Sequence, residues 1–225
     1  MVPLILASNS PRRRELLSLV GLPFIILPVD VDETPLPGEK VADCVLRLSE
    51  LKARAARDKS SQMGLLNGQV ILASDTLVVN DQEILGKPKN AKDARRMLEL
   101  LRGHTHQVIT GIALTTVGSS DLVADTCITD VPMRNYSDAE IEAYIQSGDP
   151  MDKAGAYAIQ HVDFHPVEHM TGCYASVMGL PLCHIARNLT KFDIQIFEDV
   201  PTACQGSLNY ECPVFESILE PGGPE

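Results

Sequence analysis

Apolar residues recur along this chain with two different periods, and these periods predict where strands and helices lie. Continuous apolar runs bounded by polar turns predict buried strands; they cover residues 3–7, 24–27, 70–79, 84–85, 107–117 and 122–134. Apolar stripes spaced three and four residues apart predict amphipathic helices; they cover residues 11–20, 41–57, 91–102 and 182–190. Another helix is expected after the capping-box sequence Ser137-Asp138-Ala139-Glu140. Asn80-Asp81 predicts a hairpin turn between the strands at 70–79 and 84–85. A polar turn at 118–121 predicts that the last two long strands form an antiparallel pair.

The first predicted strand leads into a stretch with anion-binding character. Ser10 stands where a helix N-cap belongs, and Pro11 occupies the first helical position, where its missing N–H costs nothing. Three arginines from position 12 crowd the first turn, although the positive end of the helix dipole disfavours cations there. Backbone N–H groups, serine hydroxyls and guanidinium groups together favour a site for phosphate. The alternative is that the arginines only solvate a surface helix.

A lysine and an aspartate stand out because they interrupt apolar patterns. In the helix at 41–57, the stripe of Val41, Val45 and Leu48 continues to Lys52. The lysine either extends its ammonium to solvent or points it into a cleft, and the pattern favours neither. Asp75 lies in the middle of the strand at 70–79, where an unpaired carboxylate is costly. We therefore expect Asp75 to have a partner and to be the chemically active carboxylate, the alternative being an aspartate in a turn at the strand end.

Two further segments carry candidate ligands. The loop with Asp30, Asp32 and Glu33 suits a divalent cation bound through oxygen, although a solvated acidic loop is the commoner outcome. Lys87, between a glycine and a proline, occupies a rigid, exposed place that suits a phosphate contact.

The stretch 148–160 combines charged residues with small ones. Lys153 follows an aspartate and precedes small residues that allow close backbone approach, and a short strand is expected to end at Gln160. A glutamine side chain offers both donor and acceptor atoms, which reading the edge of a nucleobase requires.

Composition limits the functional classes. The chain has 225 residues with 44% hydrophobic residues, which allows a substantial core, and a formal net charge of -11, which argues against a nucleic-acid or membrane-surface binder. Six scattered cysteines without a C-x-x-C pair are typical of a reducing compartment, with a Cys204–Cys212 disulfide as an unsupported alternative. No leader or long apolar run is present, so we expect a cytoplasmic protein.

Several motifs in a consistent order over about residues 3–192 resemble the Maf family of nucleotide pyrophosphatases, in particular its dTTP/UTP-acting branch. The matching segments are Ala7-Ser8-Asn9-Ser10-Pro11-Arg12-Arg13, Asp32-Glu33, Leu48 through Lys52-Ala53, Asp75-Thr76, Gly86-Lys87-Pro88, Thr110-Gly111, Asp149-Pro150-Met151-Asp152-Lys153-Ala154-Gly155-Ala156-Tyr157 with Ile159-Gln160, and Val177-Met178-Gly179-Leu180-Pro181. The resemblance implies an α/β fold, a mixed β-sheet with flanking helices and two lobes around a cleft, similar to inosine triphosphate pyrophosphatases. It also implies a homodimer and hydrolysis of nucleoside triphosphates to the monophosphate and pyrophosphate with a divalent cation (Mg²⁺, Mn²⁺ or Co²⁺).

The same resemblance assigns residue roles. Asp75 matches the proposed catalytic carboxylate, described as the proton acceptor. Positions linked to pyrimidine preference correspond to Arg12, Thr76 and Gln160, and cleft positions for phosphate and metal correspond to Ser8, Arg13, Glu33, Lys52, Lys87 and Lys153. Because a free aspartate is a weak base at neutral pH, Asp75 acts either as general base or as a metal ligand whose ion acidifies water, and Glu33 either shares that metal or does not.

The chain departs from the family pattern at Ser74, Ala158 and His161, and the last two flank the predicted base-reading Gln160. We expect residues 1–195 to form the pyrophosphatase domain and residues 196–225 to form an acidic, proline- and glycine-containing tail that is extended or partly disordered. The alternatives to the dTTP/UTP activity are the same chemistry with a purine or modified-base preference, and a non-catalytic nucleotide-binding regulator of cell division.

Overall fold

The computed structural model describes residues 2–220 and builds them around one six-stranded mixed sheet. The strands are β1 (Leu4–Leu6), β2 (Phe24–Ile26), β3 (Val70–Asn80), β4 (Glu83–Leu85), β5 (Thr105–Thr116) and β6 (Leu122–Pro132). The α-helices are α1 (Pro11–Ser18), α2 (Val41–Gln62), α3 (Ala91–Leu101), α4 (Asp138–Gln146), α5 (Tyr174–Val177), α6 (Leu182–Leu189), α7 (Val200–Leu208) and α8 (Phe215–Leu219). Three 3-10 helices, η1 (Asp149–Asp152), η2 (Ala154–Ala156) and η3 (Thr190–Phe192), lie between them. The predicted α/β class with a mixed sheet and flanking helices is confirmed.

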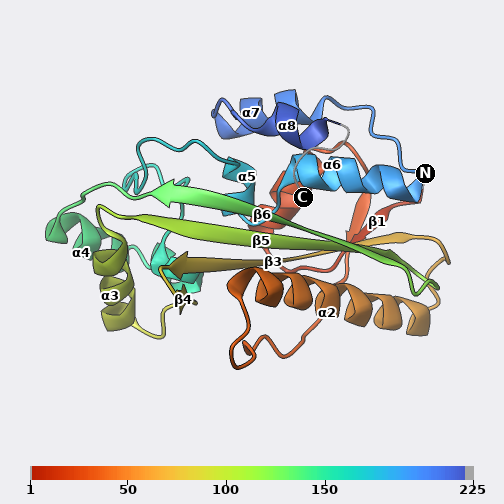
Figure 1. The fold of residues 1–225 in the computed structure, drawn as a ribbon, viewed down its shortest axis with the longest axis horizontal. Coiled ribbons are helices and arrows are strands. Elements are labelled where there is room, and N and C mark those ends of the chain that lie inside the picture. Colours follow the sequence, from red (N-terminus) through yellow and green to blue (C-terminus); the bar gives the residue numbers. More distant parts are fainter. Residues whose placement is uncertain (1, 221–225) are drawn as a thin grey trace.

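The strand order is β2-β1-β3-β5-β6, with β4 paired to β3 outside this path. β1 is parallel to β2 and β3, whereas β3, β5 and β6 are antiparallel neighbours. Figure 1 shows α2 against one face of the sheet and α5 and α6 on the other, with α7 and α8 outside α6. The group of α3, β4 and α4 lies at one end of the long strands, away from β1 and β2. The segment after β1 therefore enters the middle of the molecule.

Local sequence signals explain several element boundaries. The Ser10 side chain accepts a hydrogen bond from the backbone N–H of Arg13 and begins α1, as its position before a proline predicts. The capping box of Ser137 and Glu140 is present at the start of α4. Asp81, with φ of 54°, turns β3 into β4 in the expected hairpin. The antiparallel pair β5–β6 also forms as predicted.

A close approach of backbones fixes α2 against the sheet. Gly111 on β5 lies under α2, and a Cβ atom placed there would come within 2.7 Å of the Val45 carbonyl oxygen. Only glycine therefore allows α2 to lie at this distance from β5. Because Val45 and Lys52 are separated by two helical turns, this contact also determines where the lysine lies over the sheet.

Two expectations were wrong in the described residues. The segment ending at Gln160 forms a turn rather than a strand, since residues 154–156 form the 3-10 helix η2, in which Gly155 has a φ of 69°. The acidic segment after residue 195 is not extended. It contains α7 and α8, whose Val200 and Ile218 are buried. Although the segment is acidic overall, both helices carry a few apolar residues that pack against α6. The remaining residues of the predicted tail, 221–225, lie outside the described part of the chain.

Candidate functional site

A buried ion-pair cluster lies where α2 crosses β3. The Lys52 ammonium is 2.5 Å from Asp75 Oδ1 and 2.6 Å from Glu33 Oε1. Lys52 and Asp75 are almost completely buried, whereas Glu33 reaches in from an exposed loop with 62% of its side chain accessible. Removing charges from water costs several kcal/mol per ion, so the lysine and Asp75 compensate each other. The ambiguity over Lys52 is resolved: its ammonium points inward at Asp75.

The periodicities of helix and strand create this cluster. Val45 and Leu48 on α2 are buried against the sheet, and Lys52 continues the same stripe at the next turn. Asp75 stands opposite Gly111 in the β3–β5 register. Residues directly opposite in a sheet share a face, so Asp75 points toward α2 and meets the lysine.

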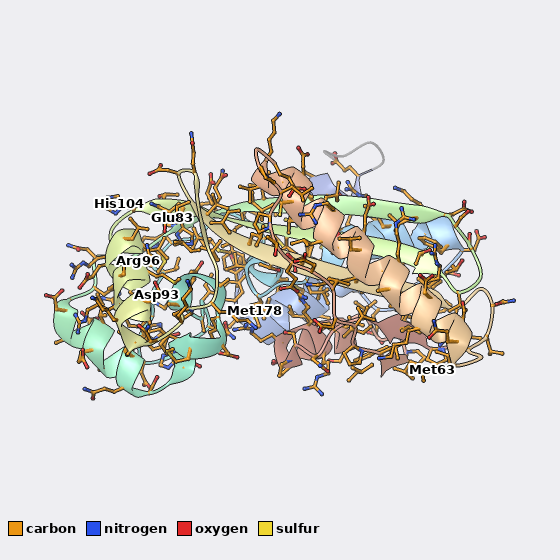
Figure 2. All side chains as sticks on the ribbon, turned by 90° about the horizontal axis from the view of Figure 1, so that it is seen from below. Met63, Glu83, Asp93, Arg96, His104 and Met178 are labelled. Carbon is orange, nitrogen blue, oxygen red and sulfur yellow. The ribbon has the colours of Figure 1, made fainter. Side chains whose placement is uncertain are left out.

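The opposite face of β3 carries a second cluster around Arg13. Its Nε donates to the Gly179 carbonyl oxygen at 2.9 Å, its Nη1 to the Ser74 carbonyl oxygen at 2.7 Å, and its Nη2 to Thr76 Oγ1 at 3.0 Å. Burial lowers the pKa of the guanidinium, and the negative charge of Asp75 opposes this. Figure 2 shows Met178, the residue before Gly179, near the middle of the molecule. Arg13 therefore joins α1, β3 and the segment after α5.

Hydroxyl groups extend the Arg13 cluster across the sheet. Thr76 Oγ1 lies 3.0 Å from Thr110 Oγ1, and Thr110 donates to the Ser176 carbonyl oxygen at 2.8 Å. Ser74 Oγ donates to Gly179 O at 2.9 Å. Sequence reasoning did not single out Thr110 and Ser176 as site residues, because their partners come from distant segments.

The loop between β1 and α1 and the first turn of α1 carry the remaining N-terminal candidates. Ser8 is buried, and its Oγ accepts a hydrogen bond from the backbone N–H of Ser10 at 3.1 Å. Arg12 is partly buried and lies close enough to Asp152 to contribute to its lowered pKa, of which the hydrogen bond from Lys153 is the largest cause. The first turn of α1 and η1 thus lie near each other.

Lys153 is held by three oxygen atoms of its own segment. Its Nζ lies 2.6 Å from the Asp149 carbonyl oxygen, 3.0 Å from Asp149 Oδ1 and 2.7 Å from Asp152 Oδ1. Tyr144 Oη donates to Asp149 Oδ2 at 2.6 Å and accepts from the Ala158 N–H at 2.9 Å. Tyr144, another residue that sequence reasoning missed, ties α4 to this segment.

Lys87 and Gln160 are exposed side chains. Among the predicted residues, the structure brings Glu33, Lys52 and Asp75 into one contact cluster and Arg13 and Thr76 into another. Ser8, Lys87, Lys153 and Gln160 belong to neither set of direct contacts.

Glu33 and Asp75 are the predicted metal ligands. Within residues 2–220, no group of three or more His, Cys, Asp or Glu side chains has the arrangement of a complete metal site. The two carboxylates nevertheless converge on one cation, the Lys52 ammonium. Mg²⁺ is commonly held by one or two carboxylates together with substrate phosphates, so this donor pair fits a cation that arrives with its substrate.

Two surface cavities lie outside this cluster. One, of about 690 Å³, is bordered by Asn9 of the N-terminal loop, Asp30 and the α2 residue Lys59. The other, of about 990 Å³, lies between β6, α6 and the C-terminal segment, and Arg187 and Asp199 line it. Neither is lined by Lys52 or Asp75. The described residues also include no helix with the length and apolar character needed to cross a membrane.

Comparison with known proteins follows the same segments. The model of a family described as Maf-like protein matches residues 3–192. A protein of Geobacter sp. (strain M21) is 46% identical over 182 residues, covering 81% of this chain and 91% of the relative. A protein of Chromobacterium violaceum is 47% identical over 191 residues, covering 85% and 95%. One of Pasteurella multocida is 43% identical over 195 residues, covering 85% and 96%. All three relatives are named dTTP/UTP pyrophosphatase.

Proposed function

The chain belongs to the Maf family, and from this membership and the cluster at Asp75 we infer that it is a nucleoside triphosphate pyrophosphatase. It hydrolyses dTTP and UTP to the monophosphate and pyrophosphate, the activity for which its relatives are named. The observation that carries the assignment is the buried Lys52–Asp75 pair, which Glu33 reaches from an exposed loop. Such a pair provides a carboxylate for water and a cation for phosphate within one contact.

We propose that Asp75 orients the attacking water and either accepts its proton directly or would serve as a ligand of a divalent cation. Lys52 neutralises negative charge as the triphosphate approaches and holds the Asp75 carboxylate in place by its contact at 2.5 Å. When the triphosphate oxygens pair with the Lys52 ammonium, an oxygen of Asp75 becomes available to bind the water. The pyrophosphate then leaves as the new bond to the α-phosphorus forms.

A divalent cation, Mg²⁺, Mn²⁺ or Co²⁺, is proposed as the cofactor. Glu33 and Asp75 would hold it, because both carboxylates already converge on the Lys52 ammonium. The bound ion supplies charge neutralisation at the phosphate and lowers the pKa of coordinated water. Since the loop that carries Glu33 is exposed, this carboxylate can change partner without displacing the sheet.

We propose that the remaining predicted residues bind substrate around this centre. Ser8 and the N–H groups that begin α1 face the phosphates, together with Arg12, Lys87 and Lys153. Gln160 and Thr76 contribute to base preference. Because protein acceptors already hold the Arg13 guanidinium, its part in substrate binding is to keep Thr76 in place.

We also propose that the protein is a homodimer and is located in the cytoplasm. The cytoplasmic location is supported by the six cysteines, all of which are free thiols. Light scattering of the purified chain would give twice the monomer mass if the dimer forms.

The activity is tested by measuring pyrophosphate release from a panel of pyrimidine, purine and modified nucleoside triphosphates, with Mg²⁺, Mn²⁺, Co²⁺ or EDTA. We expect metal-dependent release from dTTP and UTP. We expect a loss of about a hundredfold or more in Asp75→Asn, because this change removes the proton acceptor or metal ligand. The matched control is Asp81→Asn, which changes an exposed aspartate in the turn between β3 and β4. This variant should retain full activity.

Other outcomes have distinct meanings. Release mainly from purine or modified nucleotides would keep the reaction and refute the base preference. Orthophosphate as the only phosphate product would refute the pyrophosphatase. Tight nucleotide binding without turnover would favour the regulatory protein instead.

A further inference from the structure

The segment that carries Lys153 and Gln160 has an irregular backbone that other elements must hold in place. It runs from η1 through η2 and contains two consecutive residues in the left-handed region, Gly155 with a φ of 69° and Ala156 with a φ of 59°. A residue other than glycine rarely adopts this conformation, and it persists only where its surroundings fix it. The contacts that hold this segment therefore also determine where the Lys153 and Gln160 side chains lie.

Tyr144 of α4 holds this segment at two points. Its hydroxyl donates to Asp149 Oδ2 at 2.6 Å and accepts from the Ala158 backbone N–H at 2.9 Å. The residue is 3% exposed, and its ring stacks on that of Phe164 with 4.2 Å between the ring centroids. Burial and the contact with Asp149 raise the pKa of Tyr144, so the hydroxyl stays protonated and able to donate. Both the ring and the hydroxyl of Tyr144 are thus fixed in position.

The first of these contacts continues through Asp149 to Lys153. The Lys153 ammonium donates to Asp149 Oδ1 at 3.0 Å and to the Asp149 carbonyl oxygen at 2.6 Å. Its other carboxylate partner is Asp152 at 2.7 Å, whose side chain is 75% exposed against 32% for Asp149. Lys153 therefore resembles Lys52 in having one carboxylate fixed by other contacts and one exposed carboxylate that a phosphate can displace. Tyr144 supplies the contact that fixes the first of these at Lys153.

The second contact fixes the turn that contains Gln160. The Ala158 carbonyl oxygen accepts a hydrogen bond from the His161 N–H at 3.1 Å, which closes a four-residue turn with Gln160 in its third position. Because the Tyr144 hydroxyl accepts from the N–H of the same Ala158, it anchors the first residue of this turn. A buried N–H without an acceptor is costly, so removing the hydroxyl should let the turn move.

We propose that Tyr144 is a positioning residue of the substrate site, whose buried hydroxyl holds Lys153 toward the phosphates and Gln160 toward the base. This role rests on the proposed hydrolysis of nucleoside triphosphates, in which both residues bind substrate. Tyr144 acts through them and not by contact with the nucleotide, since it is buried. Loss of its hydroxyl should therefore weaken substrate binding and alter base preference, while the reaction at Asp75 proceeds as before.

The test is the kinetics of pyrophosphate release by Tyr144→Phe, measured at a temperature at which the variant is folded. Phenylalanine keeps the stacked ring and removes only the hydroxyl. We expect KM for dTTP to rise about tenfold while kcat changes by less than about twofold, because the lost hydrogen bonds position groups that bind substrate. The ratio of kcat/KM for dTTP to that for dATP should fall as well, because the turn with Gln160 is no longer anchored.

Tyr136→Phe is the matched control. Tyr136 is also buried, its hydroxyl donates to the Leu98 carbonyl oxygen at 2.7 Å, and its ring packs against the same Phe164. This variant also loses one buried hydroxyl, so its melting temperature should fall, but it should keep the wild-type KM and base preference. Wild-type KM and base preference in Tyr144→Phe, or the same changes in both variants, would overturn the proposal.

A double-mutant cycle tests the route through Lys153. In a Lys153→Met background, Tyr144→Phe should raise KM for dTTP less than it does in wild type, because the group that it positions is already missing. An equal rise in both backgrounds would overturn the route through Asp149 and Lys153. If Tyr144→Phe does not fold, Asp149→Ala decides, since it removes the same support from a partly exposed position, and a wild-type KM in that variant would refute the route.

Nucleotide binding distinguishes failure of this inference from failure of the proposed function. If the wild-type protein releases no pyrophosphate, the proposed function is wrong, and calorimetric titration with dTTP decides on Tyr144. Weaker binding by Tyr144→Phe but not by Tyr136→Phe would support the positioning role. Equal binding by all three proteins, or no binding by the wild type, would overturn it.

Discussion

Two cations lie on opposite faces of β3 and serve different purposes. Lys52 meets two carboxylates, one of them on an exposed loop, so its contacts can rearrange when a polyanion arrives. Arg13 donates to two carbonyl oxygens and one hydroxyl that come from two segments, β3 and the residues after α5. Both residues were predicted from sequence as phosphate ligands. The structure favours direct contact with phosphate more for Lys52 than for Arg13. The roles of both residues in substrate binding stay predictions.

Replacing Arg13 with lysine tests its positioning role. An ammonium group cannot reproduce the planar fork of a guanidinium, so Arg13→Lys should lose at least one partly buried hydrogen bond. We expect the free energy of unfolding to fall by about 1–3 kcal/mol in urea titrations. Arg14→Lys, an exposed neighbour, should change it little. Unchanged stability combined with a raised KM would instead mean that Arg13 mainly contacts substrate.

His106 gives stability a pH dependence of known sign. The side chain is buried on β5, its Nε2 lies 2.9 Å from Tyr157 Oη, and desolvation lowers its pKa to about 4. In the unfolded chain the imidazole takes up a proton as the pH falls below about 6.5, whereas the buried imidazole stays neutral down to about pH 4. The contribution of neutral His106 to the free energy of unfolding is therefore present above about pH 6.5 and is lost as the pH falls toward about 4. The contribution amounts to roughly 3 kcal/mol.

Urea titrations across this pH range measure the effect. Wild type should lose more stability between about pH 7 and pH 4 than His106→Gln, whose side chain does not titrate. Because both proteins contain the same carboxylates, only the difference between their pH profiles counts. Parallel profiles would show that burial does not keep the His106 imidazole neutral.

At the scale of elements, the approach of α2 to the sheet creates the site. Gly111→Ala should push α2 away from β5, because its Cβ would lie 2.7 Å from the Val45 carbonyl oxygen. We expect a loss of about 1–3 kcal/mol in stability and a lower kcat, because Lys52 moves relative to Asp75. Gly206→Ala in α7, where a Cβ meets nothing within 4 Å, is the matched control. Wild-type activity in Gly111→Ala would contradict the dependence of the site on this contact.

Strong periodic signals predicted the elements that hold the site. The strand with Asp75, the helix with Lys52 and the hairpin after Asn80 follow from local patterns, and the structure has all three. The Arg13 cluster could not be predicted from local patterns. Its acceptors on Ser74 and Gly179 lie 61 and 166 residues away, and both are backbone oxygens, which have no side-chain signature in the sequence. The turn at Gln160 was missed because small residues fit a strand and a 3-10 helix equally well.

At the scale of the whole molecule, the C-terminal segment belongs to the folded structure. Val200 of α7 and Ile218 of α8 are buried, and both helices pack on α6. Acidic composition and prolines predicted a tail, but a few apolar residues suffice to dock a short helix. The domain boundary at residue 195 stays a prediction.

Ending the chain at Gln195 tests that boundary. Burying one large aliphatic side chain contributes about 1.5–3 kcal/mol, so losing two of them should cost several kcal/mol and lower the melting temperature markedly. Calorimetry of the shortened chain measures the loss, and a chain ending at Glu220 is the control. A shortened chain with wild-type melting temperature and turnover would make the segment an accessory, as its composition first suggested.

The most direct test of the central claim is the fate of the attacking oxygen. dTTP is hydrolysed in water labelled with heavy oxygen, and both products are weighed by mass spectrometry. Attack at the α-phosphorus, oriented by Asp75, predicts one heavy oxygen in the monophosphate and none in the pyrophosphate, with this labelled product lost in Asp75→Asn. Label in pyrophosphate or in orthophosphate would contradict the account, because the water would have attacked a different phosphorus atom.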